Sequence, residues 1–268
     1  MKSAHHSSNR LSKLALAAFV TAASAFSIGA EHAKEQEACA KLASHSFAKS
    51  LKLEVQKAVA NETEKFCLVN GVVNSRKGVD GKHYGIGFEM RLPLSWNGRF
   101  VYQMNGGNDG NIVPAEGHTG NGSASALARG YAVLSTNAGH AGDAAENNQY
   151  GLVAGNRFGL DPQARNDYGY AATATMTPVA RQIMSVFYNK LPEYSYLAGC
   201  SNGGRHGMVA ASRYGDMFDG ILVGAPGFNL PKAAVQHAWD IQSTLQVAPK
   251  LSEAFSRDNM AFLTRKVV

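Results

Sequence analysis

A short motif in the second half of the sequence has the residue types of a catalytic serine turn. The segment G-C-S-N-G at 199–203 matches the pattern G-x-S-x-G, in which a serine sits between a strand and a helix. The apolar run 194–198 precedes the motif, and a stretch with helical spacing, 203–214, follows it. The glycines permit the close backbone approach that such a strained turn needs. The motif predicts Ser201 as a nucleophile, and a glycine-rich helix N-cap without catalysis is the alternative.

Acyl transfer at a serine also requires hydrogen-bond donors for the developing oxyanion. One donor is the backbone N–H of the residue after the serine, here Asn202, and the other comes from the loop after the third strand. The glycine-rich segment 105–110 directly follows the predicted strand 99–104. We predict Gly107 as this donor, with Gly106 as the alternative, although an ordinary turn has a similar composition. No G-x-x-x-x-G-K-[ST] pattern occurs, so a phosphate-binding loop is not indicated.

The elements that must position these groups follow a β/α pattern. Strands are expected at 66–70, 84–92, 99–104, 131–136, 194–198 and 221–224, and helices at 33–60, 122–129, 178–191 and 203–214. The stretch 138–169 is polar and rich in Gly and Asn, which predicts a surface loop. Strands that alternate with helices predict an α/β fold with a doubly wound, mostly parallel sheet. The length of the chain fits one large core, so we expect a single domain.

The first 30 residues have the composition of a secretory signal peptide. Three basic residues flank the start of a short apolar run at 14–20, and small residues at 23–25 or at Ala30 offer a cleavage site. A membrane anchor needs about 20 mostly apolar residues, which is more than this run provides. We therefore predict a secreted or periplasmic protein without a membrane anchor, whose mature domain spans 31–268.

The net charge of +6 does not indicate a nucleic-acid partner. Lys2, Arg10 and Lys13 lie in the predicted signal peptide, which leaves +3 on the remaining chain. No Lys/Arg-rich run and no basic stripe with interleaved aromatic residues follows. We expect a small-molecule partner, and neither nucleic acid nor a membrane.

If the protein is exported, its cysteines are expected to form disulfides. In an oxidising compartment Cys39, Cys67 and Cys200 favour disulfides, but an odd number leaves one thiol unpaired. The pair nearest in sequence is Cys39 with Cys67, which would join the mature N-terminus to the first strand. Buried free thiols are the alternative. Cys200, directly before the predicted nucleophile, is then the expected free thiol.

Several segments together resemble the tannase and feruloyl esterase family. They are G-C-S-N-G-G-R-H-G with the preceding Y-S-Y-L, the following R-Y-G-D-M-F-D-G-I-L-V-G-A-P-G-F-N, and the upstream W-N-G-R-F and Y-A-V-L-S-T-N-A-G-H. The resemblance runs from about Cys39 to the C-terminus and is most specific over 167–229. It implies a secreted α/β-hydrolase that acts on small-molecule esters of aromatic acids. One departure is Asn137, where many members of the family carry Asp.

The resemblance also implies roles for the residues of the motif. Ser201 corresponds to the family's nucleophile, and Asn202 and Gly107 to its oxyanion donors. In the family the cysteine before the nucleophile forms a disulfide with a cysteine beside the catalytic histidine. Cys200 fits the first half of this arrangement, and the sequence contains no second half.

The general base is the part of the triad that the sequence does not supply. This fold carries its triad in the order Ser, Asp/Glu, His, and only His206 and His237 follow the serine. We expect His206 to be a helix-surface or core residue, because it lies more than a turn into the helix. His237 falls in an expected helix after the last strand, and His140 precedes the nucleophile as a structural loop residue.

The resemblance implies a pattern that continues well beyond Val268. The missing parts are the last strands, an inserted lid with a calcium-binding acidic motif, the triad acid and the His-Cys pair. We therefore expect a truncated N-terminal portion of a serine esterase, with no metal or cofactor site of its own and almost no activity alone. Two alternatives stay open: an inactive remnant or binding module of the same fold, and a small esterase that uses His237.

Overall fold

The computed structural model describes residues 36–61, 63–118, 124–142, 155–247 and 256–267. The chain divides into two compact units, Met1–Pro226 and Gly227–Val268. The domain predicted over 31–268 contains both units, and the sequence pattern indicates no boundary between them. The predicted signal peptide at 1–30 lies outside the described residues.

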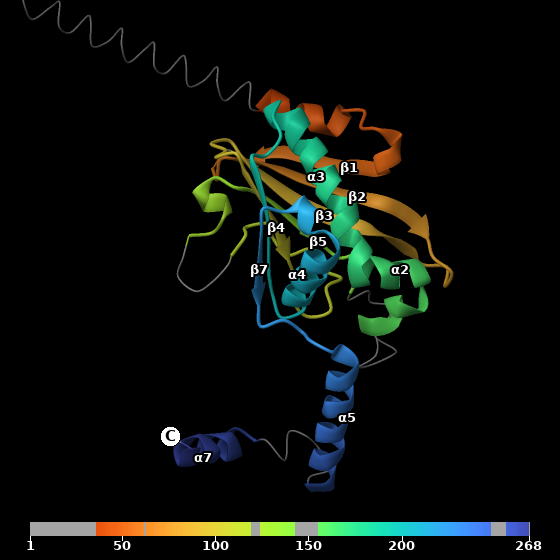
Figure 1. The fold of residues 1–268 in the computed structure, drawn as a ribbon, viewed down its shortest axis with the longest axis vertical. Coiled ribbons are helices and arrows are strands. Elements are labelled where there is room, and N and C mark those ends of the chain that lie inside the picture. Colours follow the sequence, from red (N-terminus) through yellow and green to blue (C-terminus); the bar gives the residue numbers. More distant parts are fainter. Residues whose placement is uncertain (1–35, 62, 119–123, 143–154, 248–255, 268) are drawn as a thin grey trace, which may run out of the picture. The chain divides into compact units, whose positions relative to one another are not determined.

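A seven-stranded sheet in the order β1-β2-β3-β5-β4-β6-β7 forms the centre of the first unit (Figure 1). Neighbouring strands from β1 to β5 pair antiparallel, and β5, β4, β6 and β7 pair parallel. The strands are β1 (Leu53–Asn61), β2 (Phe66–Lys77), β3 (His83–Pro93), β4 (Arg99–Met104), β5 (Ala132–Thr136), β6 (Tyr194–Cys200) and β7 (Gly220–Gly224). The parallel part brings the carboxyl ends of β4 and β6 to one edge, where open α/β sheets bind their ligands.

Two long helices, α3 and α4, lie over one face of this sheet (Figure 1). The labelled helical elements of the first unit are η1 (Lys49–Leu51), η2 (Leu127–Arg129), α2 (Pro162–Asn166), η4 (Asp167–Ala171), α3 (Ala172–Tyr188), α4 (Asn202–Arg213) and η5 (Gly215–Met217), and residues 36–44 and 155–160 are helical as well. The main core lies between this face and the helices and includes Phe88, Tyr102, Ile183 and Leu197, all at most 1% exposed. The second unit contains α5 (Leu230–Val247) and α7 (Arg257–Val267).

The prediction of a helix over 33–60 is wrong for its second half. Residues 36–44 are helical, but Leu53–Asn61 form β1, which pairs antiparallel with β2. Lys, Glu and Ala favour helices by intrinsic propensity, but propensity is a weak preference that tertiary contacts override. Here the backbone of β2 supplies the hydrogen bonds, and side chains along most of β1 alternate between partly buried and exposed positions.

The surface loop predicted over 138–169 is also wrong for 155–169, whereas 138–142 form a turn and 143–154 lie outside the described residues. Residues 155–160 form short 3₁₀ turns, and α2 and η4 then run directly into α3. Asp161 begins this run, because its carboxylate accepts a hydrogen bond from the N–H of Ala164 and pairs with Arg76 at 2.5 Å. The hydrogen bonds and the charge of Arg76 hold the pKa of Asp161 well below its usual range. The polar residues of this stretch therefore serve as a cap and a buried ion pair.

A disulfide joins Cys39 to Cys67, with 5.7 Å between the Cα atoms. It connects the helical segment 36–44 to β2, and both side chains lie in the core. Cys200 is a free, exposed thiol. The structure thus contains the pair that is nearest in sequence.

Tyr188 closes the core at the end of α3. Its ring stacks on Trp96 with 4.0 Å between the ring centroids, and its hydroxyl donates a 2.9 Å hydrogen bond to the carbonyl of Pro93. Tyr188→Phe keeps the stack and removes this bond, so we expect urea unfolding to show a loss of about 1 kcal/mol. Tyr194→Phe, at an exposed ring, is the control and should stay within about 0.5 kcal/mol of the wild type. Equal losses in the two variants would contradict a role for this bond.

Candidate active site

Ser201 occupies a sharp turn between β6 and α4. Its backbone has φ 59° and ψ −122°, a conformation that residues other than glycine adopt rarely and at a cost of about 1–3 kcal/mol. The turn is held on both sides: the N–H of Ser201 donates to the carbonyl of Gly224 at 3.0 Å, and the carbonyl of Ser201 accepts from the N–H of Arg205 at 3.0 Å. The strand–turn–helix predicted around Ser201 is therefore present, and the serine is exposed at its tip.

The two glycines of the motif are required by backbone that approaches within contact distance. A Cβ added at Gly199 would lie 2.5 Å from the carbonyl carbon of Gly203 and 2.7 Å from the Cβ of Met104. A Cβ added at Gly203 would collide with the carbonyl group of Met104 and lie 3.0 Å from the carbonyl oxygen of Asn105. The helix α4 can begin directly against the end of β4 only because these positions lack side chains.

A cavity of about 740 Å³ opens beside the serine. Its walls are largely apolar and include the polar side chains of Glu116 and His118. His118 Nε2 and the Glu116 carboxylate lie 2.7 Å apart, and Arg91 contacts the same carboxylate at 3.2 Å. These contacts, that of His118 first, lower the pKa of Glu116. The lining residues are Gln103, Met104, Asn105, Gly106, Val113, Pro114, Glu116, His118, Ala198, Gly199, Cys200, Ser201, Leu222 and Gly224.

The predicted oxyanion donors directly follow two segments that line this cavity: Gly107 follows 103–106, and Asn202 follows 198–201. Asn202 is the first residue of α4, and the first N–H groups of a helix have no partner within the helix. Gly106 lines the cavity together with Ser201. Gly107 follows with φ +65°, and a Cβ at this position would meet no atom within 4 Å. The start of the glycine loop and the start of α4 lie close together, and backbone N–H groups so arranged are candidates for an oxyanion hole.

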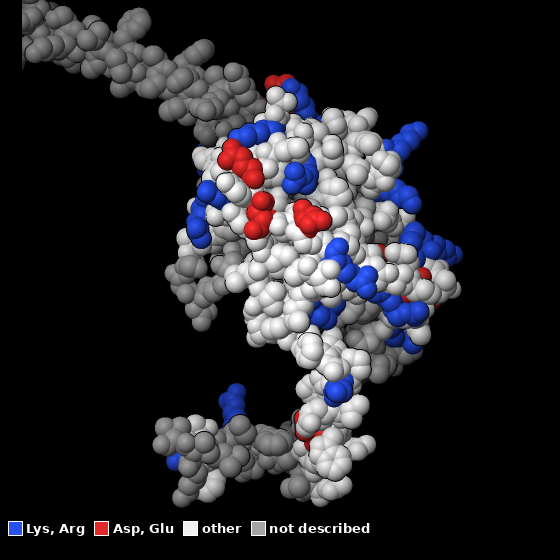
Figure 2. Space-filling model, viewed as in Figure 1, with Lys and Arg blue, Asp and Glu red and all other residues white. Residues whose placement is uncertain are grey.

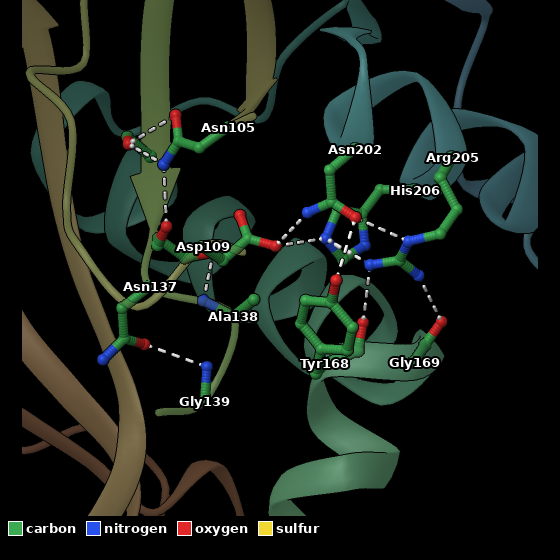
Figure 3. A network of polar contacts seen from close by, with 12 residues as sticks. Asn105, Asp109, Asn137, Ala138, Gly139, Tyr168, Gly169, Asn202, Arg205 and His206 are labelled. Atoms are coloured by element: carbon green, nitrogen blue, oxygen red, sulfur yellow. Dashed lines mark hydrogen bonds and ion pairs between the residues drawn. The ribbon is translucent and has the colours of Figure 1, made fainter. Parts of the chain in front are cut away.

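A buried polar network connects the same loop to α4 (Figure 3). Asp109 Oδ2 lies 2.7 Å from His206 Nε2 and accepts a 2.7 Å hydrogen bond from Asn202 Nδ2. Asn202 Oδ1 in turn accepts from Arg205 Nε at 2.7 Å and from the hydroxyl of Tyr168 at 3.2 Å. Sequence reasoning placed His206 on the helix surface or in the core. The structure buries it, and its role as the partner of Asp109 is new.

Arg205 extends this network to η4. Its guanidinium donates to the carbonyl oxygens of Tyr168 and Gly169 at 3.2 and 3.3 Å (Figure 3). It also lies over the ring of Tyr168, 4.4 Å from the centroid. The sequence analysis did not single out Asp109, Tyr168 or Arg205. Arg205 stands within the G-C-S-N-G-G-R-H-G segment, but nothing in the local pattern connects it to Tyr168.

His140 lies next to this network and is buried without hydrogen bonds. Its ring stacks on Phe158 with 3.6 Å between centroids, and among the described residues neither ring nitrogen has a hydrogen-bond partner. Burial lowers the pKa of His140 to about 4, against the weaker opposing effects of Asp109 and of the backbone of Asn108 and Ala138. These backbone groups lie near the ring without hydrogen-bonding geometry. His140 is thus a neutral structural histidine.

No histidine is hydrogen-bonded to Ser201 in the described ranges. His206 faces Asp109, and His140 is enclosed by Phe158 and Tyr168. His237 lies on α5, in the second unit. The described residues therefore present a serine turn and two candidate oxyanion donors without a base in contact.

Comparison with known proteins decides the family. A family model described as tannase and feruloyl esterase matches residues 67–258, well over half of the chain. This chain belongs to the tannase and feruloyl esterase family. The resemblance on which the sequence analysis relied is thereby confirmed.

The relatives of this family member include named hydrolases. The chain is 37% identical to mono(2-hydroxyethyl) terephthalate hydrolase of Piscinibacter sakaiensis over 220 residues. The aligned region covers 79% of this chain and 36% of that protein. It is 32% identical over 167 residues to a probable feruloyl esterase B-1 of Aspergillus fumigatus, covering 62% of this chain and 28% of the relative. The chain thus spans about a third of the length of these curated relatives.

A solved structure shows the same fold. Feruloyl esterase B of Aspergillus oryzae matches with a TM-score of 0.58 and 25% identity, over 73% of this chain and 38% of that chain. The predicted α/β-hydrolase fold is confirmed, with a sheet that is mixed because β1, β2 and β3 pair antiparallel. None of the helices in the described ranges combines the length and the apolar character that crossing a bilayer requires.

Proposed function

We propose that this family member carries the nucleophile and the oxyanion donors of a serine carboxylic-ester hydrolase for esters of aromatic acids. The observation that carries the proposal is the backbone of Ser201, which is held in a rare conformation at the tip of a strand–turn–helix and opens onto the cavity. Strain of this kind persists where the surrounding structure enforces it, and it is concentrated at functional sites. The aromatic substrate class is supported by the family and by the names of the relatives.

The chemistry follows from the positions of these groups. The hydroxyl oxygen of Ser201 adds to the ester carbonyl, and its proton passes to a base. The negative charge that develops on the carbonyl oxygen is stabilised by the N–H groups of Asn202 and Gly107, with Gly106 as the alternative second donor. Collapse of the tetrahedral species expels the alcohol and leaves an acyl-serine, which water hydrolyses to the acid and free serine.

We propose that the general acid and base of the triad are not among the residues of this chain. The support is that His206 contacts Asp109, that His140 is stacked on Phe158, and that His118, in the cavity wall, contacts Glu116. The fold also places its acid and histidine late in the chain. Hydrolases without a complete triad keep only about 10³–10⁴-fold catalysis over water. The chain alone should therefore hydrolyse aromatic esters very slowly.

Labelling with a fluorophosphonate probe tests the nucleophile. We expect the chain to be labelled slowly and at one site, which peptide mapping by mass spectrometry locates at Ser201. Ser201→Ala should remove the label, and Cys200→Ala, the neighbouring control, should keep it. An unlabelled Ser201 in a folded chain would favour the inactive remnant or binding module. Rapid hydrolysis of an aromatic methyl ester, abolished by Ser201→Ala, would contradict the proposal that the base is missing from this chain. If His237→Ala also abolished this hydrolysis, the result would favour the small esterase that uses His237.

Export is proposed on two supports. The first 30 residues have the pattern of a signal peptide. The disulfide between Cys39 and Cys67 is a bond that persists mainly in oxidising compartments. A secreted or periplasmic location follows from both.

On the face that Figure 2 shows, basic side chains lie at several separate places with acidic groups among them. This distribution supports a small-molecule rather than a nucleic-acid partner.

A further inference from the structure

We infer that Asp109 is a positioning residue that fixes the oxyanion loop to the start of α4. The inference rests on the proposed function, because it assigns a role to Asp109 in the geometry of the two N–H donors. Asp109 lies two residues after Gly107, and its carboxylate contacts both Asn202 and His206 of α4 at 2.7 Å. The Asp109 and His206 side chains are only 2% and 4% exposed. One buried carboxylate thus connects the element of one donor to the element of the other (Figure 3).

The protons of the network can be assigned from the chemistry of its groups. An ionised carboxylate only accepts hydrogen bonds, so the 2.7 Å contact places a proton on His206 Nε2. Arg205 Nη2 lies 3.0 Å from the same nitrogen, but both atoms are then donors and this contact is not a hydrogen bond. Asn202 fits in one orientation only, with its NH₂ toward Asp109 and its oxygen toward Arg205 and Tyr168.

The loop follows a backbone course with repeated positive φ values, which glycine adopts readily and which has a cost at Asp109. Gly107 and Gly110 have φ values of +65° and +82°, and Asp109 between them has φ 55°. The loop is tied to the end of β5 through the N–H of Gly110, which donates to the carbonyl of Asn137 at 3.1 Å. Asp109 adds the tie to α4. Without its carboxylate, the buried donors of Asn202 and His206 lose their acceptor, and leaving such donors unsatisfied is unfavourable.

Two variants and a matched control separate positioning from general stability. Asp109→Ala removes the acceptor, whereas Asp109→Asn keeps an oxygen that can accept both hydrogen bonds. Asp161→Ala removes a different buried carboxylate, which pairs with Arg76 at the cap of α2 and is absent from the network around Asn202. All three proteins are compared with the wild type by circular dichroism, thermal unfolding, amide hydrogen exchange and the kinetics of fluorophosphonate labelling.

Labelling kinetics at varied probe concentration give a rate constant and a half-saturation concentration. Asp109→Ala should lower the rate constant by at least about tenfold, because misplaced oxyanion donors affect the transition state. The half-saturation concentration should stay within about twofold, because the cavity walls are untouched. Asp109→Asn should recover most of the rate. Asp161→Ala should lower the thermal midpoint without changing the rate constant, and an equal loss of rate in Asp161→Ala would overturn the inference.

Hydrogen exchange tests the connection independently of the serine. Both Asp109→Ala and His206→Leu should speed exchange in 105–110 and in 202–206 together, whereas Asp161→Ala should not. If His206→Leu leaves 105–110 unchanged, the inference is overturned, and this variant also replaces Asp109→Ala should the latter not fold. A wild type that labels no faster than Ser201→Ala would refute the proposed function. In that case the hydrogen exchange result alone tests the inference. Faster exchange in both 105–110 and 202–206 supports the connection through Asp109, and unchanged exchange contradicts it.

Discussion

Gly203→Ala is expected to lower the free energy of unfolding of the first unit by more than about 3 kcal/mol, although alanine is the better helix former. Gly203 lies in the first turn of α4, where helix propensity alone predicts a gain of up to about 1 kcal/mol. The added Cβ, however, would collide with the carbonyl group of Met104 and lie 3.0 Å from that of Asn105. Backbone at the end of a central strand cannot move aside cheaply, so the steric effect is larger than the propensity gain.

Urea unfolding followed by circular dichroism measures this loss against a matched control. Gly215 begins η5, has no atom within 4 Å of an added Cβ, and is exposed. Gly215→Ala should therefore stay within about 0.5 kcal/mol of the wild type or gain slightly. If Gly203→Ala were as stable as Gly215→Ala, the contact between α4 and the end of β4 would be looser than the structure shows. Ser201 would then lose the support for its strained backbone.

The same contact explains why the serine turn could be predicted from a few letters. Gly199 and Gly203 are close in sequence, and each is needed because backbone of the same turn or the end of β4 approaches it closely. The pattern can be recognised because the strand, the turn and the helix that carry it are consecutive in the sequence. The strands β4, β5, β6 and β7 were predicted for a related reason, since buried strands have a strong local pattern.

The buried network could not be predicted because its partners are far apart in the chain. Asp109 and His206 are separated by 97 residues, and Arg76 and Asp161 by 85. Both aspartates occur in polar, glycine-rich stretches that are typical of surface loops. Only the fold reveals that their carboxylates are buried and paired. The helix prediction failed over β1 for a similar reason, because pairing with the neighbouring strand β2, rather than the composition of β1 itself, determines its conformation.

The network also changes how the histidines of this chain are understood. From the sequence, His206 was expected on a helix surface or in the core and His140 in a structural loop, and only His237 was considered as a base. In the structure, His206 is fixed to Asp109 and His140 is buried without hydrogen bonds. Among the described residues, neither ring is hydrogen-bonded to Ser201. The cavity beside the serine instead has His118 and Glu116 in its walls, and these two side chains contact each other.

Acidification from pH 7 to pH 5 is expected to reduce the stability of the first unit by about 2 kcal/mol through His140 alone. The pKa of His140 is lowered to about 4, against about 6.5 in the unfolded chain. Between these two values the unfolded state binds more protons, so the free energy of unfolding falls as the pH falls. The loss begins near pH 6.5 and approaches about 3 kcal/mol below pH 4. The cause is burial against Phe158 without a hydrogen-bond acceptor for the charged ring.

Urea unfolding at a series of pH values isolates this contribution when the wild type is compared with His140→Leu. Leucine has a similar volume and does not titrate, so the variant should lack the part of the slope that falls between pH 6.5 and 4. Carboxylates such as Asp161, whose pKa is depressed, also lose stability on acidification, but they contribute equally to both proteins. The difference between the two curves therefore reports His140. Parallel curves would mean that His140 accepts a proton in the folded state, which requires an acceptor or a solvent path at its ring.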